Sequence, residues 1–452
     1  MKIPSFLPSA VVYQISLRSF TREGTLRAAE AMLPHVKVVG VDVVYLTPFV
    51  EMDTDMDRSG WSPRQIKSGF ETPKNPYRIS DYTKVDPEYG TEGDLVAFVA
   101  AAHGLGLKVF FDLVYLHCGP NNVIQKDIPD AFQRNEDGSV KTTVWRFPYI
   151  NFASPAVREY LYANMTHFAK DVGCDGFRCD VGDEVPEDFW YEGLRRMQRL
   201  NPDFAMINEG SQPGHVQRAF HCNYGWNFSW GLRECATGTF KPGRSLVDTI
   251  AEQKAYEAKC PPEALELFFF ENHDTANDEW ENRIDRVLPV EAGNAILVGA
   301  FLRRGVAMLY NGNEIADNSL MSFFGPVEHP ARARKTVDWA RALQPAGQKR
   351  LALVRKLAEL RHTVSAFAQG TMDYLATSAP EKSFAFQRTA PDGSRILVVV
   401  NLSNETRELA IPAFSDFEKA ASAPALLAQD CAPDATGCFR AGPFSYWVSA
   451  PF

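Results

Sequence analysis

Carboxylate side chains stand where several short apolar segments of this chain end, and they are the residues best suited to chemistry. Asp180 lies two residues after Arg178, and Asp112, Glu209 and Asp274 follow other segments of the same kind. Four carboxylates gathered in one cleft would repel one another, which raises at least one pKa unless a cation such as Arg178 offsets the effect. A general acid at neutral pH needs a raised pKa, and paired carboxylates are typical of sugar-cleaving chemistry.

A single acidic residue after a strand is ordinarily a helix cap or a turn residue, so each position alone is weak evidence. Four such residues on separate segments, together with Arg178, His117 and His273, favour catalysis instead. A metal-dependent hydrolase is a competing interpretation, because these histidines and carboxylates are all good metal ligands. The chain offers no compact HxH or HExxH spacing to support that interpretation.

The elements that must position these residues alternate along the chain, short apolar runs with amphipathic helical stretches. Eight runs are candidate strands, which fits a closed parallel barrel with its active site at the carboxyl ends of the strands. The candidates are 11–15, 41–46, 108–113, 176–178, 204–207, 220–224, 267–270 and 306–310, with 220–224 the least regular of them.

The helix before the fourth strand has clear start and stop signals in the sequence. Ser154 can cap it, Pro155 suits its first position, and Gly173 can end it. The apolar side chains between them recur at helical spacing and predict one buried stripe. They are Val157, Leu161, Met165 and Phe168.

Two regions break the alternation. Residues 118–152 are polar and too long for an ordinary strand-to-helix loop, which predicts a small inserted domain after the third strand. From residue 371 short alternating runs predict an antiparallel β-sandwich. The predicted fold is therefore α/β, a (β/α)8 TIM barrel made of residues 1–117 and 153–370, with the insertion at 118–152 and the sandwich at 371–452.

Composition excludes several classes of function. A formal net charge of −9 argues against nucleic acid or an anionic membrane as the main partner, since both favour a basic surface.

The beginning of the chain has no signal-peptide pattern, and no apolar run could span a bilayer. The eight cysteines lack CxxC pairs, which indicates free thiols in a reducing cytoplasm, although Cys431 and Cys438 could bridge a surface loop.

Four ordered motifs resemble the four short sequence regions of glycoside hydrolase family 13, the alpha-amylase family. Segments near the first, second and eighth strands resemble that family as well, so the resemblance covers nearly the whole chain. The four motifs are Asp112-Leu113-Val114-Tyr115-Leu116-His117, Gly176-Phe177-Arg178-Cys179-Asp180, Glu209, and Asn272-His273-Asp274.

The resemblance implies a retaining hydrolase that acts on α-glucosidic bonds of α-glucans or malto-oligosaccharides. Asp180 would be the nucleophile, Glu209 the general acid and base, and Asp274 the residue that holds the sugar. An α-glucosyl transferase or isomerase on sucrose- or trehalose-type substrates is the alternative. A non-catalytic relative would have lost the nucleophile or the acid, and both are present. The implied substrate-binding residues are Tyr77, Asp112, His117, Arg178 and His273.

Three departures from the family pattern limit what the resemblance implies. Leu116 stands where the family has an Asn ligand of a structural calcium ion, so neither that calcium site nor any other metal or cofactor is expected. Residues 181–184 replace a Lys-His pair that binds the leaving-group sugar, so acceptor recognition should differ. Arg78 follows Tyr77 where chain-end enzymes often have an acid, and it would block a terminal pocket or meet an acidic substrate group.

Four tryptophans in loop-like sequence are candidate platforms for the flat faces of sugar rings. Packing in the hydrophobic core is an equally good interpretation of each. They are Trp61, Trp145, Trp226 and Trp230.

Overall fold

Eight short parallel strands form a closed barrel in the computed structural model, which describes residues 2–278, 280–322, 324–325, 336–412, 414, 416–434 and 436–452. All eight predicted strands are present, and the last in the chain pairs with the first. The barrel strands are β1 (Val11–Ile15), β2 (Val43–Leu46), β5 (Lys108–Leu113), β6 (Gly176–Cys179), β7 (Ala205–Asn208), β8 (Cys222–Tyr224), β9 (Leu265–Phe269) and β10 (Val306–Tyr310).

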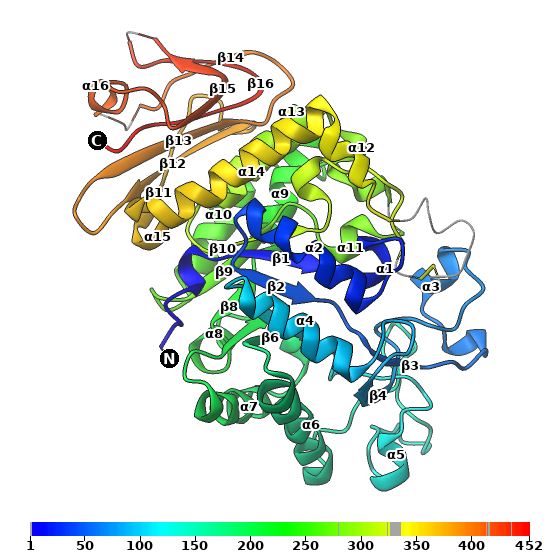
Figure 1. Cartoon of the computed structure of the whole chain (residues 1–452). Coiled ribbons are helices and arrows are strands. Elements are labelled where there is room, and N and C mark those ends of the chain that lie inside the picture. The colour runs from blue at the N-terminus through cyan, green and yellow to red at the C-terminus, as the bar shows by residue number, and fades with distance from the viewer. Residues whose placement is uncertain are drawn as a thin grey trace.

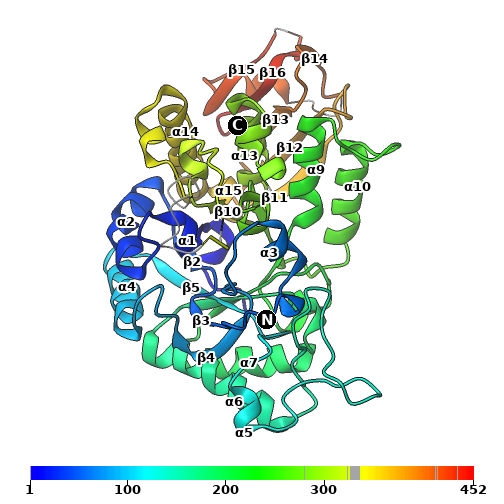
Figure 2. The same ribbon diagram turned by 90° about the vertical axis from the view of Figure 1, so that its right-hand side faces the viewer.

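Helices surround the barrel on its outside (Figures 1 and 2). The long ones are α2 (Leu26–Val39), α4 (Glu92–Gly104), α6 (Pro155–His167), α7 (Glu187–Leu200), α9 (Trp226–Thr237), α10 (Leu246–Glu257), α13 (Val290–Phe301) and α14 (Pro345–Thr363). Shorter helices of the barrel region are α1 (Leu17–Phe20), α8 (His215–Arg218), α11 (His273–Ala276), α12 (Ile284–Val287) and α15 (Ser365–Gln369). Helices α3 (Pro63–Lys67) and α5 (Ile124–Asp127) lie in loops that leave the barrel, and α16 (Phe417–Ala420) lies beside the C-terminal sheet.

The bounds of helix α6 follow from its sequence. It begins at Pro155 after Ser154, whose backbone is extended, and its apolar stripe is buried as predicted. A wide turn over Phe168–Val172 follows, and Gly173 ends the segment in the left-handed region with φ 91°. Glycine adopts that conformation without strain, so the chain can turn there and enter β6.

The barrel interior is apolar toward one end and charged toward the other. Alternate side chains of each strand point inward, so Phe110 and Asp112 share one face of β5, while Gly176 and Arg178 share one face of β6. Gly176 makes room in the apolar layer, since a Cβ there would lie 2.5 Å from the Phe110 ring. The next layer toward the carboxyl ends therefore holds Asp112 and Arg178, and functional side chains follow directly above them.

Two excursions leave the barrel near these carboxyl ends. The predicted insertion forms α5 and several isolated antiparallel bridges, among them His117 with Tyr149. A second excursion, not predicted, lies between β3 (Val50–Met52) and β4 (Ile79–Val85), which form a two-stranded antiparallel sheet, and it carries α3.

An antiparallel sheet of six strands follows the barrel, as the alternating runs predicted. Figures 1 and 2 show it at the opposite end of the molecule from α5 and α6. Its strands are β11 (Thr371–Leu375), β12 (Ser383–Thr389), β13 (Arg395–Asn401), β14 (Arg407–Leu409), β15 (Leu427–Pro433) and β16 (Phe439–Val448). All eight cysteines are free, so Cys431 and Cys438 form no bridge.

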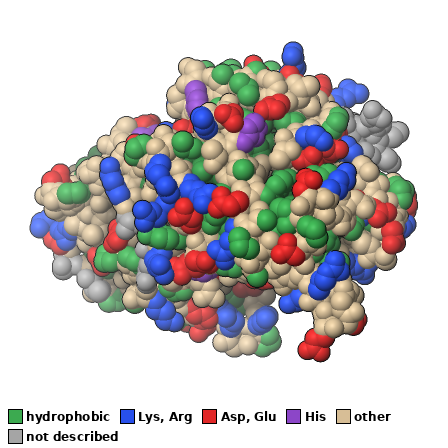
Figure 3. Space-filling model, turned by 90° about the horizontal axis from the view of Figure 1, so that it is seen from below, with side chains coloured by type: hydrophobic (Ala, Val, Ile, Leu, Met, Phe, Trp, Pro, Cys, Tyr) green, Lys and Arg blue, Asp and Glu red, His purple; other side chains and the backbone are tan. Residues whose placement is uncertain are grey.

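None of the helices in the described part of the chain has the length and apolar character needed to cross a bilayer. Figure 3 shows acidic and basic side chains interspersed over one face of the molecule.

Candidate active site

One guanidinium group lies at the centre of the charged layer. Arg178 Nη1 binds Asp112 Oδ1 at 2.7 Å and Asp180 Oδ1 at 2.9 Å, and Nη2 lies 2.6 Å from Glu209 Oε1. Asp112 is held further by the hydroxyls of Tyr45 at 2.6 Å and Tyr77 at 3.0 Å. Carboxylates from three neighbouring strands thus share one buried cation, which offsets much of their mutual repulsion.

A cavity of about 240 Å³ opens above this layer. Six predicted site residues line it together, while Asp112 and Arg178, also predicted to bind substrate, do not line it and lie beneath it. The lining residues are Ser62, Arg64, Asn75, Tyr77, His117, Trp145, Phe147, Asp180, Val181, Glu209, His273, Asp274 and Phe324.

Asp180 presents one oxygen to the cavity. Arg178 binds its Oδ1, whereas the buried Oδ2 has no hydrogen-bond partner among the described residues, and His117 Nε2 lies 3.7 Å from it. Burial raises the pKa of Asp180 well above its ordinary value, although the Arg178 guanidinium opposes that rise. The arrangement leaves one carboxylate oxygen available as a nucleophile.

Glu209 is held between β6 and β7. Its Oε2 accepts a hydrogen bond from the Val181 amide at 3.0 Å, and Val181 adopts a left-handed backbone with φ 43° to present that amide. A β-branched residue rarely adopts this conformation, and such strain often marks a functional position. Burial, and next the charge of Asp274, raise the pKa of Glu209 to about 7 against the opposing Arg178. A carboxyl with that pKa can donate a proton near neutral pH.

His273 and Asp274 lie on α11 above β9. Gln14 on β1 binds the His273 ring nitrogen Nδ1 at 2.7 Å and accepts from the His273 amide at 3.0 Å. Tyr77 stacks on the His273 ring with centroids 5.4 Å apart, and its hydroxyl lies 2.7 Å from Nε2. Burial lowers the pKa of His273 to about 4, so the ring is neutral at pH 7.

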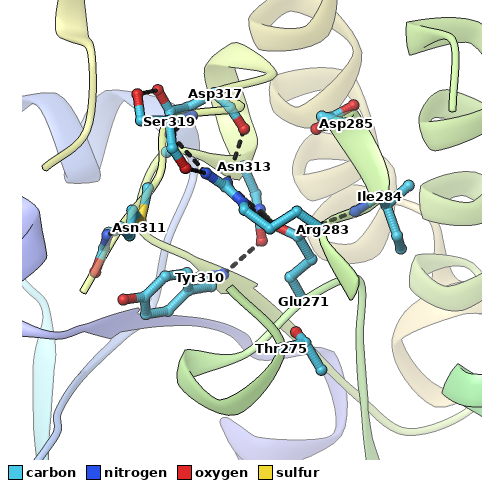
Figure 4. A network of polar contacts seen from close by, with 12 residues as sticks. Glu271, Thr275, Arg283, Ile284, Asp285, Tyr310, Asn311, Asn313, Asp317 and Ser319 are labelled. Atoms are coloured by element: carbon cyan, nitrogen blue, oxygen red, sulfur yellow. Dashed lines mark hydrogen bonds and ion pairs between the residues drawn. The ribbon is translucent and has the colours of Figure 1, made fainter. Parts of the chain in front are cut away.

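A buried ionic network supports the loop that carries these residues (Figure 4). Glu271, directly after β9, pairs with Arg283 at 3.2 Å and accepts from the Asn313 side-chain amide at 3.0 Å. Arg283 also pairs with Asp317 at 3.0 Å. The segments that follow β9 and β10 are thereby joined, and a fully buried pair that lost one member would be costly.

The insertion supplies the opposite wall. His117 packs against Trp145 and Phe147 with ring centroids 5.4 and 5.2 Å away, and burial lowers its pKa to about 3. Of the four candidate tryptophans, Trp145 lines the cavity and Trp61 is fully buried. Trp226 and Trp230 lie on α9 and do not line the cavity.

Arg64 is a cavity residue that sequence reasoning missed. It comes from α3, and its Nη1 donates to Asp274 Oδ1 at 2.7 Å. Nothing in the local sequence marks it, because the contact spans 210 residues. Ser62, Asn75, Phe147 and Phe324 were missed in the same way.

Arg78 does not have either of its predicted roles. It is fully buried, does not line the cavity, and its Nη1 lies 3.3 Å from Asp53 Oδ1. Its guanidinium also donates to the Asp55 carbonyl at 3.2 Å. Arg78 therefore holds the 53–78 excursion together from within.

The segment after Asp180 binds the loop after Glu209. Asp183 accepts hydrogen bonds from the Asn208 side chain at 2.8 Å and from the amides of Ser211 and Gln212 at 2.7 and 3.1 Å. The residues that replace the family's Lys-His pair are thus used to fix the strand end that carries Glu209.

The residues at the family's calcium position do not fit a calcium ion. Leu116 offers an apolar side chain that is 3 % exposed, and its carbonyl already accepts from the Ile150 amide at 3.0 Å. Within the described ranges no group of three or more His, Cys, Asp or Glu side chains is arranged to hold a metal ion.

Comparison with known proteins agrees with the motifs. The family model described as "Alpha amylase, catalytic domain" matches residues 13–137. Alpha-amylase MalA of Haloarcula japonica is 25 % identical over 433 residues, which are 91 % of this chain and 58 % of the relative. A cyclomaltodextrinase of a Bacillus species is 23 % identical over 88 % of this chain and 73 % of its own length.

The fold also has close counterparts among solved structures. A noncanonic maltogenic alpha-amylase, AmyB from Thermotoga neapolitana, superposes with a TM-score of 0.79 at 22 % identity, covering 98 % of this chain and 99 % of that one. The barrel and the following antiparallel sheet are therefore an architecture already known from other proteins.

Proposed function

Because the alpha-amylase catalytic-domain model matches residues 13–137 and relatives of that kind align with most of the chain, we propose that it is a retaining glycoside hydrolase that cleaves α-glucosidic bonds of α-glucans or malto-oligosaccharides. The observation that carries the proposal is the placement of Asp180 and Glu209. Both line one cavity and both pair with the guanidinium of Arg178, which holds two carboxyl groups close together as a retaining mechanism requires.

In the first step Asp180 Oδ2 attacks the anomeric carbon while the bond from that carbon to the leaving oxygen breaks. Glu209 transfers its proton to the leaving oxygen, so the first sugar product departs neutral. The pKa of about 7 supports this role, since burial keeps a large fraction of Glu209 protonated near neutral pH.

In the second step a water molecule attacks the same carbon and Glu209, now ionised, takes its proton. The bond to Asp180 breaks, the carboxylate is restored, and the product keeps the α configuration. Asp112 and Asp180 leave the layer around Arg178 with excess negative charge, which favours the positive charge that develops on the sugar ring.

Tyr77, His117, His273 and Asp274 would hold the sugar whose bond is cleaved. Both histidines are neutral at working pH, because burial lowers their pKa values to about 3 and about 4. A neutral imidazole can donate one hydrogen bond to a hydroxyl without repelling the developing cationic ring.

The test is a time course of products from malto-oligosaccharides, sucrose and trehalose, with Asp180→Asn as the blank. We expect shorter sugars whose first-formed anomer is α by nuclear magnetic resonance. Longer or rearranged sugars would instead support a transferase or isomerase. A β anomer, or full activity in Asp180→Asn, would refute the retaining mechanism.

We propose that the substrate is a free oligosaccharide and that the protein works in the cytoplasm, with neither nucleic acid nor membrane as a partner. Eight free cysteines, most of them buried, support a reducing compartment. Fractionation of the native cells followed by immunodetection tests this, and recovery of the protein outside the cytoplasm would contradict it.

We also propose that the insertion is stable without calcium. Leu116 packs with apolar residues of the insertion, including Ile150, where a calcium ligand would otherwise stand. The melting temperature should be the same after exhaustive chelation and in millimolar calcium. A rise in melting temperature at micromolar calcium would overturn this proposal.

A further inference from the structure

Arg64 binds one short loop across the cavity through both of its terminal nitrogens. Nη1 donates to Asp274 Oδ1 at 2.7 Å, and Nη2 donates to the carbonyls of Asp274 at 2.7 Å and Asn277 at 2.6 Å, with that of His273 at 3.5 Å. The planar fork of a guanidinium fixes both the carboxylate and the backbone that carries it.

We propose that Arg64 is a positioning residue that holds Asp274 in one orientation and in its charged form for sugar binding, an inference that rests on the proposed function. Arg64 donates a hydrogen bond to Oδ1 of Asp274. The other oxygen, Oδ2, lies 3.3 Å from His273 Nε2 and can accept a hydrogen bond from a sugar hydroxyl. A carboxylate with one oxygen fixed offers the other at a defined angle.

The charges around Asp274 show why a cation is needed there. Arg64 faces it from α3, His273 from its own helix, Arg178 from β6, and Glu209 from the end of β7. His273 is neutral at pH 7, and Arg178 already pairs with three other carboxylates. Of the cations that face Asp274, Arg64 is the one that pairs with it directly, at 2.7 Å. Although burial raises the pKa of Asp274, His273 and Arg64 bring it below its ordinary value.

The short helix that carries Arg64 is itself fixed. The Ser62 hydroxyl caps it by accepting from the Gln65 amide at 3.1 Å. The buried Gln65 side chain donates to the carbonyls of Thr72 at 2.8 Å and Pro73 at 3.0 Å. An arginine on such a support loses little rotamer freedom when it binds, so its contacts with Asp274 are preorganised.

The first experiment compares the kinetics of Arg64→Ala, Arg64→Lys and the control Lys67→Ala. Lys67 lies on the same helix and pairs with Glu281, but both side chains are mostly exposed. We expect kcat/KM to fall about 10- to 100-fold in Arg64→Ala, the range for a lost hydrogen bond to a charged group. The control should stay within about twofold of wild type, as exposed pairs contribute little.

The second experiment measures maltotriose binding by calorimetry in an Asp180→Asn background, where no turnover occurs. Protonation of Asp274 should weaken binding at acid pH, and Arg64→Ala should move that loss to higher pH. Arg64→Lys should restore the pH dependence, because it keeps the charge, while affinity stays below that of the parent because the fork is gone.

The outcomes separate the two proposals. A wild-type protein that neither binds nor converts any α-glucoside refutes the proposed function. An active wild type in which Arg64→Ala behaves like Lys67→Ala refutes the role of Arg64. An acid limb of binding that stays in place in Arg64→Ala refutes the control of Asp274's charge, even if the affinity falls.

Discussion

At the scale of single residues, the main feature of the site is that one arginine pairs with three carboxylates. Arg178 pairs with Asp112, Asp180 and Glu209. Its positive charge favours the ionised form of each carboxylate, whereas the three carboxylates disfavour ionisation of one another. Replacing one carboxylate therefore changes the proton affinity of the remaining two. Effects of mutations in this group will not be additive, because the residues act as one unit.

The proposed role of Glu209 predicts the pH dependence of catalysis. A general acid must carry its proton, and burial raises the pKa of Glu209 to about 7, so kcat/KM should fall about tenfold per pH unit above that value. His117 and His273 are neutral throughout this range, since burial lowers their pKa values to about 3 and about 4, and they add no inflection.

Rates measured between pH 4 and pH 10 test this assignment. Glu209→Gln should lower kcat by about 10²- to 10⁴-fold, the usual contribution of a general acid, and its residual rate should lack the alkaline limb. A limb that persists in Glu209→Gln would assign it to another group.

At the scale of elements, the barrel makes the floor of the cavity and two excursions make its walls. Residues 53–78 contribute Arg64 and Tyr77, and residues 118–152 contribute Trp145 and Phe147. The floor is set by strand pairing, whereas the walls depend on contacts between loops. Changes in the walls should therefore alter substrate binding more than the chemical step.

Trp145→Ala tests the wall from the insertion. Loss of an aromatic platform, about 0.5–1.5 kcal/mol, should raise KM about 2- to 10-fold with little change in kcat. Trp61→Ala is the contrasting variant, because Trp61 is fully buried and its loss should lower the free energy of unfolding by about 3–5 kcal/mol. An unchanged KM in Trp145→Ala would exclude it as a platform.

Asp183→Ala tests the segment that fixes the strand end of Glu209. Its carboxylate accepts from two exposed backbone amides of the following loop, and the loss of these bonds should lower the free energy of unfolding by about 0.5–1.5 kcal/mol. We expect kcat to fall more than KM rises, since Glu209 would lose its alignment. Glu184→Ala, at an exposed neighbouring position, should change neither constant.

The sequence predicted the floor better than the walls. Every barrel strand was predictable, because short apolar runs recur between amphipathic helices, and Asp180 and Glu209 follow such runs. Arg64 and the excursion that carries it were not, since no periodicity or local motif marks a contact across 210 residues. Arg78 was misplaced for the same reason, because its buried position depends on how the whole 53–78 excursion folds.

At the scale of the whole molecule, helix α13 joins the barrel to the C-terminal sheet. It packs against β9 and β10 on one side and against β13 and β16 on the other. Ten of its twelve residues are buried, which explains a sequence that is apolar on every face. The sheet therefore completes the burial of a barrel helix.

Gly299→Ala tests that junction. A Cβ at Gly299 would lie 2.6 Å from Cζ of Phe384 on β12, so the sheet must shift away at a cost of about 1–3 kcal/mol. Denaturant unfolding should show this loss, with kcat unchanged at low temperature. Gly104→Ala, where a Cβ would meet nothing within 4 Å, is the matched control and should not be destabilised.

The bond between Gln14 and His273 has a kinetic consequence. It joins the first strand to a loop 259 residues further along the chain, and β1 pairs with β10 beside it. Contacts of such long range form late, because the entropy of closing so large a loop must be offset first. A newly made chain can thus hold most of its helices and strands and still lack the proposed sugar-binding surface, which arises only when the first strand meets the loop after β9.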